Sequence, residues 1–396
     1  MRSVRKWISY LLITVMVMMA GGCAEKGSSE SETGEALPNE SQGKNYSLGV
    51  YQDGFAVLSG NGMMTIYLDE DHSYRPLCLK PECSHELEDK TCQAVLLAEE
   101  SGGWIRYHEG HLWFIPFSLG EDSYLYQTDL WGDNLKKISQ VMAGVSYTPP
   151  VLFREGKMIR VVWNFTQDEN LLPSGVDAWI TEIDLETGGE TVLAGPVHGR
   201  SSNLFLEGGY GDIIYYKVNA ESEVGERPDA ALIAINRVTG EQQTVIANVK
   251  EMQVCGICQQ WLYVKEKGAD GEKIRQYNLN DFTDKLLEMP EGEDAFRTFD
   301  VYLMEDHLLM ENERGEWWRY DPEKETMELY RTPMTDDGFT PSYQTETGYL
   351  GVVTRLGTET IPTMSQEYAF LSFEEFQDGK EPLLLSHNDK KPFSIE

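Results

Sequence analysis

The chain has 396 residues, of which 41% are hydrophobic and 11% aromatic, so it has enough apolar material for a large folded domain and is not disordered throughout. It carries 33 lysines and arginines against 66 acidic residues, which gives a formal net charge of −33. Nucleic-acid binding requires clustered basic side chains that neutralise phosphates, so this balance argues against nucleic acid as a partner.

The N-terminus has the pattern of a signal peptide. The positive charges of Arg2, Arg5 and Lys6 precede an apolar run over residues 7–20. This run of about 14 residues is shorter than the roughly 20 that a membrane-spanning helix requires. Because basic residues followed by a short apolar run are typical of an export signal, we predict that residues 1–22 form a signal peptide.

The end of this segment resembles a bacterial lipobox. Its residues are Met19-Ala20-Gly21-Gly22-Cys23, with alanine where leucine is more usual. The resemblance implies cleavage before Cys23 and lipid attachment to its thiol; the alternative is an ordinary secretory signal with an incidental cysteine. Two or three acyl chains would hold the protein stably on a membrane. We therefore expect a lipid-anchored protein on the extracytoplasmic side of the cell membrane.

Residues 23–45 are expected to form a flexible acidic tether. Positions 24–44 contain no aromatic residue and are rich in serine, glutamate and glycine. Such a composition cannot bury a core, so this segment would only lift the following domain away from the lipid surface.

From about residue 46 to residue 396 the sequence repeats weakly, every 43–56 residues. Each unit begins with a turn and a short aromatic or aliphatic strand, and it continues with a strand, a polar turn and a further strand. The first halves are YQDGFAVL, YHEGHLWFI, LFREGKMIRV, LEGGYGDIIYY, CGICQQWLYV, YLMEDHLLM and TETGYLGVV. Short strands at this spacing without helical periodicity indicate an all-β array, and about 50 residues per four-stranded unit is typical of a β-propeller.

The sequence therefore predicts an all-β fold, a propeller of seven four-stranded blades; two stacked β-sandwiches are the alternative. Fragments such as EIDLETGGET and AINRVTGEQQT resemble β-propeller lipoproteins of bacteria, which are related in fold to the YWTD and quinoprotein-like propellers. The YWTD tetrad itself is missing. The resemblance implies the fold and no activity, because the same fold hosts many functions.

Three cysteines and one histidine lie within fifteen residues: Cys78, Cys83, His85 and Cys92. We place them at the outer strand of the first blade and in the loop that leads to the second blade. Three thiolates and an imidazole match a closed tetrahedral zinc site, although the spacing is not that of a standard zinc finger. The alternative is a disulfide that leaves one thiol over. A structural zinc ion and a disulfide therefore both remain open, and either requires the side chains to converge.

Cys255 and Cys258 form a C-x-x-C pair around the first turn of the fifth unit. In an all-β context we favour a disulfide that clasps this turn over a reactive redox pair.

The sequence favours a ligand- or protein-binding module over an enzyme, because no G-x-S-x-G, H-E-x-x-H, P-loop or dinucleotide motif is present. The expected partner is an unidentified protein, glycan or small molecule. One alternative is a carbohydrate-active hydrolase or lyase that uses loop carboxylates; another is an envelope assembly scaffold. The candidate carboxylates belong to long loops that we predict between the second and third strands, at residues 165–177, 217–229 and 355–367: Asp168, Glu169, Glu221, Glu223, Glu226 and Glu359.

Overall fold

The structure is a computed structural model. It describes residues 48–51, 54–58, 63–68, 73–101, 105–116, 122–129, 132–144, 151–167, 173–199, 203–219, 229–250, 252–268, 271–290, 296–331, 339–356 and 364–384. The predicted signal peptide, Cys23 and the tether therefore lie outside the described residues.

The strands form seven four-stranded antiparallel sheets, numbered here in chain order. Sheet 1 holds β1 (Leu48–Tyr51), β2 (Gly54–Leu58), β3 (Met64–Leu68) and β4 (Ser73–Pro76); sheet 2 holds β5 (Arg106–His108), β6 (His111–Phe114), β7 (Ser123–Asp129) and β8 (Lys136–Val141). Sheet 3 holds β9 (Leu152–Arg154), β10 (Lys157–Gln167), β11 (Pro173–Asp184) and β12 (Glu190–Gly199); sheet 4 holds β13 (Leu204–Tyr210), β14 (Ile213–Asn219), β15 (Asp229–Asn236) and β16 (Gln242–Lys250). Sheet 5 holds β17 (Gln253–Cys258), β18 (Trp261–Gly268), β19 (Gly271–Asn278) and β20 (Asp284–Leu286); sheet 6 holds β21 (Phe299–Leu303), β22 (Leu308–Asn312), β23 (Trp317–Asp321) and β24 (Thr326–Arg331). Sheet 7 holds β25 (Phe339–Gln344), β26 (Gly348–Leu356), β27 (Met364–Ser372) and β28 (Leu383–Leu384).

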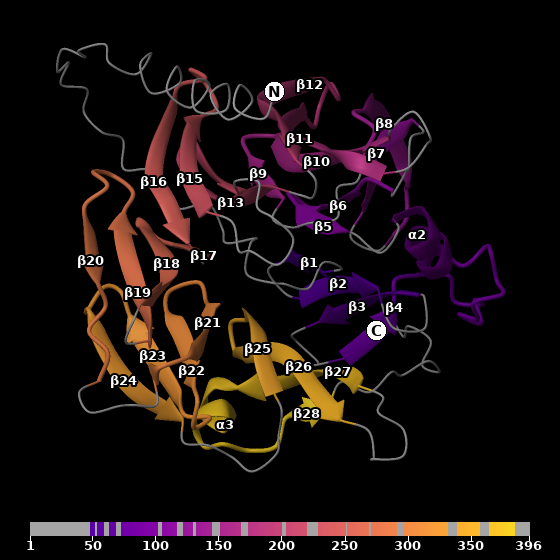
Figure 1. The fold of residues 1–396 in the computed structure, drawn as a ribbon. Coiled ribbons are helices and arrows are strands. Elements are labelled where there is room, and N and C mark those ends of the chain that lie inside the picture. Colours follow the sequence, from indigo (N-terminus) through magenta and orange to yellow (C-terminus); the bar gives the residue numbers. More distant parts are fainter. Residues whose placement is uncertain are drawn as a thin grey trace.

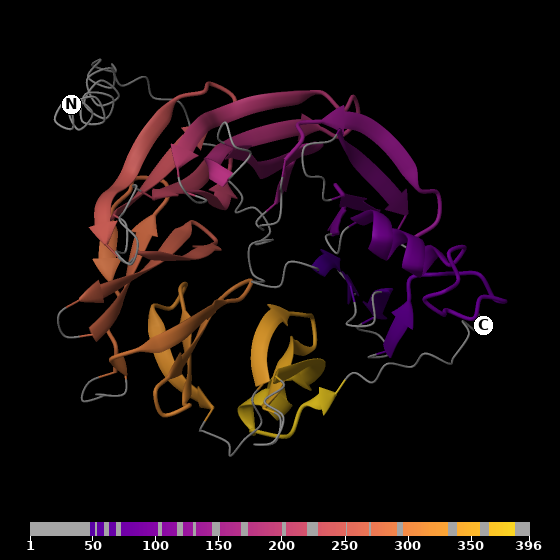
Figure 2. The ribbon, with the colours of Figure 1, turned by 45° about the vertical axis from the view of Figure 1, so that its right-hand side comes forward.

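The sheets follow one another around a central region, and the last sheet returns to the side of the first (Figures 1 and 2). In each sheet the strands pair in chain order, and the first strands of neighbouring sheets contact one another, as β1 does with β5 and β13 with β17. This is the arrangement of a β-propeller, so the predicted all-β class and propeller fold are confirmed.

The turn-and-strand units found in the sequence coincide with these sheets. The loops between the second and third strands are shorter than predicted, because the strands extend into them: β10 reaches Gln167 and β11 begins at Pro173. The carboxylates proposed for those loops lie outside the described residues. Since strands alternate in direction, the connection from one sheet to the next emerges at the same end as these loops.

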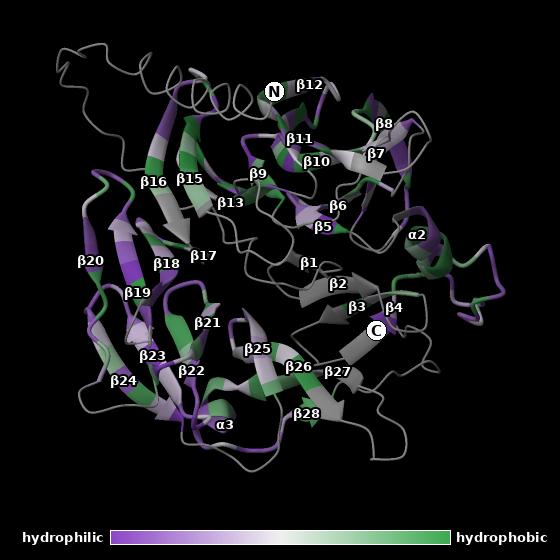
Figure 3. Cartoon of the chain, viewed as in Figure 1, coloured by the Kyte–Doolittle hydropathy of each residue, from purple (hydrophilic) through white to green (hydrophobic). Residues whose placement is uncertain are grey.

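The hydrophobic core lies between neighbouring sheets. One buried cluster joins sheets 3 and 4, and others join sheets 4 and 5, 5 and 6, and 6 and 7. Figure 3 shows the apolar residues on strands such as β15 and β22 and hydrophilic residues in many of the turns. Sheets 4, 5 and 6 therefore bury side chains on both of their faces. This explains why aromatic and branched residues are frequent in their strands.

Two short helices depart from the all-β prediction. Helix α2 (Gln93–Ser101) lies in the connection between sheets 1 and 2, and α3 (Phe373–Gln377) connects β27 to β28. The Ser372 side chain caps α3 in a capping box with Glu375. Within the described ranges, no helix is long and apolar enough to cross a membrane.

A buried ion pair joins sheet 3 to the end of sheet 2. The Arg160 side chain is fully buried on β10, and its Nη2 lies 3.0 Å from Oε1 of Glu190 on β12. The same Nη2 donates a hydrogen bond to the carbonyl of Met142 at 2.9 Å, and the Met142 amide donates to Glu190. The pair therefore fixes the chain just after β8 against the next sheet.

Candidate metal centre and a buried acid

Four metal-binding side chains meet in the connection between β4 and β5. The ligand atoms of Cys78, Cys83, His85 and Cys92 all lie within 4.8 Å of one another, and Nδ1 of His85 is 3.7 Å from Sγ of Cys92. The predicted convergence is thus observed. In a tetrahedral zinc site with Zn–S bonds near 2.3 Å, neighbouring ligand atoms are about 3.7 Å apart. The four donors are therefore close to the spacing of such a site.

Local backbone turns bring these side chains together. Cys83 donates its amide to the carbonyl of Lys80 at 3.1 Å, and Cys92 donates its amide to the carbonyl of Asp89 at 2.9 Å. His85 adopts a φ of 55°, in the left-handed region that residues other than glycine seldom enter. A histidine held in this conformation beside three thiols suggests that the position of its imidazole matters.

Burial shifts the pKa values of two members of the cluster, Cys83 and His85. Burial, with a smaller contribution from the neighbouring Cys92 and Cys78, raises the pKa of the Cys83 thiol to about 12. Burial also lowers the pKa of His85, which favours the neutral imidazole that binds metals. The Cys83 thiolate thus requires a nearby cation, and a bound metal ion would supply one.

Asp89 is not one of the four candidate ligands, but its carboxylate contacts Cys83 and holds the loop beside it. Its Oδ2 accepts a weak hydrogen bond from Sγ of Cys83 at 3.6 Å, and its Oδ1 accepts from the amide and hydroxyl of Thr91 at 2.9 and 2.6 Å. The Thr91 hydrogen bonds lower the pKa of Asp89. Lys80 donates to the carbonyl of Thr91 at 2.5 Å, so both sides of the loop are tied together. Sequence reasoning missed this role, although Asp-x-Thr is a turn signal.

Helix α2 connects the cluster to the hydrophobic core. The Cys92 carbonyl accepts the first helical hydrogen bond, from the amide of Leu96, so Cys92 lies at the N-terminus of the helix. Ala94, Val95 and Leu97 are buried in the cluster that joins sheets 1 to 3. The loop that carries the four side chains therefore leads directly into α2, at the right of Figure 1.

The arrangement can hold a metal ion with all four side chains. A disulfide would use only two of the three thiols and would leave the imidazole without a role. All five cysteines in the described part of the chain are free thiols. The disulfide alternative for Cys78, Cys83 and Cys92 remains a prediction, and the donor set fits a metal better.

Cys255 and Cys258 both lie on β17, before the turn at residues 259–260, and do not bracket it. Between Val254 and Gly256 the pairing with β18 shifts register, so Cys255 occupies a β-bulge. The Cys258 thiol is buried and donates a weak hydrogen bond to the Glu305 carbonyl at 3.5 Å. A disulfide between these two cysteines remains a prediction.

A buried carboxyl group on β13 was not found from the sequence. Glu207 occupies a β-bulge between Leu206 and Gly208, and its Oε1 lies 3.4 Å from Nζ of Lys217. Only 15% of the Glu207 side chain is exposed. Burial raises its pKa to about 7, against a smaller opposite effect of Lys217. A carboxyl group that exchanges protons near neutral pH on the inner strand of a sheet is a candidate acid or base.

This group predicts a pH dependence of stability. The folded chain keeps a proton on Glu207 up to about pH 7, whereas the unfolded chain releases it near pH 4.5. The resulting stabilisation is fully present below about pH 4.5, is lost as the pH rises through about 7, and amounts to about 3 kcal/mol. Urea denaturation between these pH values should show this loss in the wild type and not in Glu207→Gln. An identical pH profile in the variant would refute the assignment.

No protein-family model and no curated protein matches the sequence. Solved structures share its fold. A puromycin hydrolase aligns at 12% identity over 94% of this chain and 58% of its own, with a TM-score of 0.54. A puromycin-hydrolysing peptidase of Mycobacterium tuberculosis aligns at 13% identity over 89% of this chain and 55% of its own, with a TM-score of 0.52. The acylaminoacyl peptidase of Pyrococcus horikoshii aligns at 14% identity over 89% of this chain and 54% of its own, with a TM-score of 0.51.

The chain spans just over half the length of these proteins, and at such identities the likeness establishes the fold alone. It nevertheless corrects the functional hypothesis drawn from the sequence. The binding-module hypothesis was wrong, because the structures that match nearly the whole chain are named as hydrolases and peptidases, and the hydrolase alternative agrees with them better.

Proposed function

We propose that the protein is a hydrolase that acts on peptides or related aminoacyl compounds. The observation that carries the proposal is the similarity in fold to a puromycin hydrolase, which aligns with 94% of this chain. An acylaminoacyl peptidase aligns with 89% of it. Because the sequence has no G-x-S-x-G motif, the proposed nucleophile is water. Its oxygen would attack the amide carbonyl, and its proton would pass through a carboxylate to the departing amine.

Glu207 is the proposed carboxylate. Among the acidic residues that the structure describes, Glu207 has a pKa of about 7. Its side chain is 15% exposed and pairs with Lys217. As a general base it must be deprotonated, so the rate should rise as the pH passes through about 7.

The test is hydrolysis of puromycin and of an acetylaminoacyl 4-nitroanilide by the purified full chain. Glu207→Gln should lower kcat/KM at least about 100-fold. The matched control is Glu272→Gln, since Glu272 also pairs with a lysine, Lys265, at 3.1 Å, and its pairing serves the strand contacts. The control should stay within about twofold. No turnover of either compound, or turnover of oligosaccharides instead, would contradict the proposed substrate class. Full activity in Glu207→Gln would remove Glu207 from the mechanism.

For the cluster of Cys78, Cys83, His85 and Cys92 we propose a structural zinc ion. Three sulfur donors and one nitrogen donor suit zinc, and a site closed by four protein ligands has no open position for substrate. The ion would fix the loop and α2 against the first two sheets, in a propeller that we propose to be a closed ring of seven blades.

We also propose lipid attachment at Cys23, which places the protein on the outer face of a cell membrane. Cys23→Ser should move the protein from the membrane fraction to the soluble fraction after cell breakage, because the acyl chains supply the membrane affinity. Cys258→Ser serves as the control and should stay membrane-bound. A membrane-bound Cys23→Ser protein with an uncut N-terminus would contradict the lipid anchor.

A further inference from the structure

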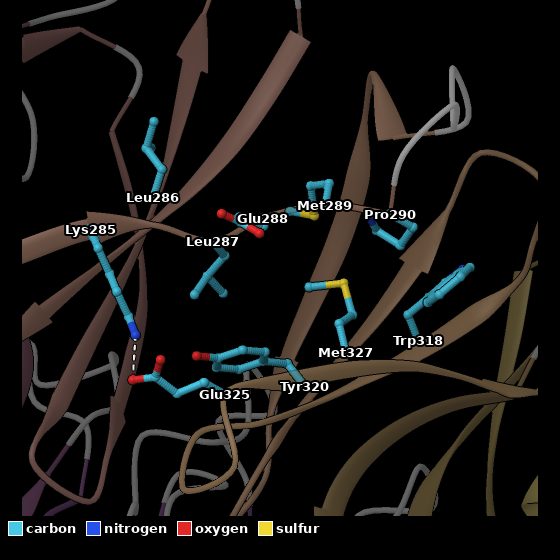
Figure 4. Close-up of a pocket in the computed structure, with 10 residues that line it drawn as sticks. All are labelled: Lys285, Leu286, Leu287, Glu288, Met289, Pro290, Trp318, Tyr320, Glu325 and Met327. Atoms are coloured by element: carbon cyan, nitrogen blue, oxygen red, sulfur yellow. Dashed lines mark ion pairs between the residues drawn. The ribbon is translucent and has the colours of Figure 1, made fainter.

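A pocket of about 460 Å³ lies between sheets 5 and 6 (Figure 4). Residues 285–290, at the end of β20 and just beyond it, form one side, and side chains of β23, β24 and the turn between them form the other. This volume falls within the range of small-molecule sites, about 300–1,000 Å³.

The lining is mixed, with six apolar and four polar residues, and two of the apolar residues are methionines. Leu287 and Met289 face Met327 across the pocket, and the ring of Trp318 lies at one end (Figure 4). Methionine side chains are flexible and polarisable, so they can adjust to a flat or branched apolar group.

Among the charged residues that line the pocket, Glu288 is the one without an ion pair to another described residue. The Tyr320 hydroxyl is already engaged, donating to Oε1 of Gln276 at 3.0 Å. Lys285 and Glu325 neutralise each other through an ion pair at 2.5 Å. The Glu288 carboxylate lies on the wall opposite Met327, is exposed to solvent, and makes no ion pair or hydrogen bond with the other described residues.

Beside the pocket, outside the residues that line it, a tryptophan ring lies near the ammonium group of Lys285. Nζ of Lys285 lies 5.7 Å from the ring centroid of Trp261 while it pairs with Glu325. An aromatic face and a carboxylate together are the usual surroundings of an organic cation. The net charge of −33 also raises the local concentration of cations around the protein.

From this geometry we infer that the pocket binds an organic cation, an ammonium group carried on a small apolar or aromatic body. The apolar part lies between Leu287, Met289 and Met327, and the ammonium group pairs with Glu288. This site goes beyond the proposed hydrolysis and does not depend on it.

The test is calorimetric titration of the full chain with benzylamine, benzyl alcohol and benzoate, which share a ring and differ in charge. Benzylamine should bind at least about tenfold more tightly than benzyl alcohol, and its affinity should fall when the salt concentration is raised. Glu288→Gln should reduce benzylamine affinity to the level of the alcohol. Glu328→Gln removes the same charge on the strand that carries Met327, but neighbouring side chains on a strand point to opposite faces, so it should change affinity less than about twofold.

Three results would overturn the inference. The first is no detectable binding of benzylamine, and the second is equal affinity for benzyl alcohol or benzoate. The third is unchanged benzylamine affinity in Glu288→Gln, which would place the cation elsewhere on the acidic surface.

Discussion

Replacing Cys92 with serine should reduce the metal content of the purified protein from about one ion per chain to less than about a tenth. The Cys92 thiol is fully buried, and its loss leaves two thiols and one imidazole, too few to close a tetrahedral site. Because Cys92 directly precedes α2, residues 78–101 should also exchange their amide hydrogens faster once the metal is lost. Elemental analysis and hydrogen exchange over residues 78–101 measure both effects.

Two comparisons separate the metal from the mere loss of a buried sulfur. Cys258→Ser removes an equally buried thiol outside the cluster and should keep the full metal content. A chelator should lower the melting temperature of the wild type and leave that of Cys92→Ser unchanged, because the variant has no metal to lose. A Cys92→Ser protein that retains a full complement of metal would contradict the assignment of this ligand.

Replacing Glu190 with alanine should lower the free energy of unfolding by about 3–5 kcal/mol. The change leaves the guanidinium of Arg160 buried without its counter-charge and removes the acceptor for the Met142 amide. Denaturant unfolding, monitored by the fluorescence of the tryptophans, measures the effect.

The matched control is Glu99→Ala, which breaks an ion pair with Lys90 on the surface, where both side chains are more than half exposed. That pair should contribute less than about 1 kcal/mol, because solvent screens it. Replacing both members of the buried pair, as Arg160→Met with Glu190→Leu, should recover most of the lost stability. Equal costs for Glu190→Ala and Glu99→Ala would show that the buried pair does not hold sheets 2 and 3 together.

The propeller could be predicted because each unit carries its own turn and strand pattern within about 50 residues. The strand ends were less accurate, since β10 and β11 continue into residues read as a loop. The helices were missed for a local reason: Gln93–Ser101 is rich in helix formers, and Ser372 with Glu375 forms a capping box, but both segments are short and interrupt a strand repeat.

The cluster of Cys78, Cys83, His85 and Cys92 could be predicted from the sequence because its four residues lie within fifteen positions of one another. The raised pKa of Glu207 could not be predicted, since it results from burial of the side chain at a bulge in β13, which outweighs the opposite effect of Lys217 on the neighbouring strand. The pocket beside Glu288 was equally hidden, because it forms only where residues 285–290 meet the strands of the next sheet. Contacts between segments distant in sequence decide both features.

The metal assignment is tested most directly by zinc-edge X-ray absorption on the full chain, combined with its metal content. A zinc ion held by Cys78, Cys83, His85 and Cys92 should appear at about one ion per chain, with three sulfur atoms near 2.3 Å and one nitrogen atom near 2.1 Å. Folded protein that contains no metal, with two of these three cysteines joined in a disulfide, would contradict the account.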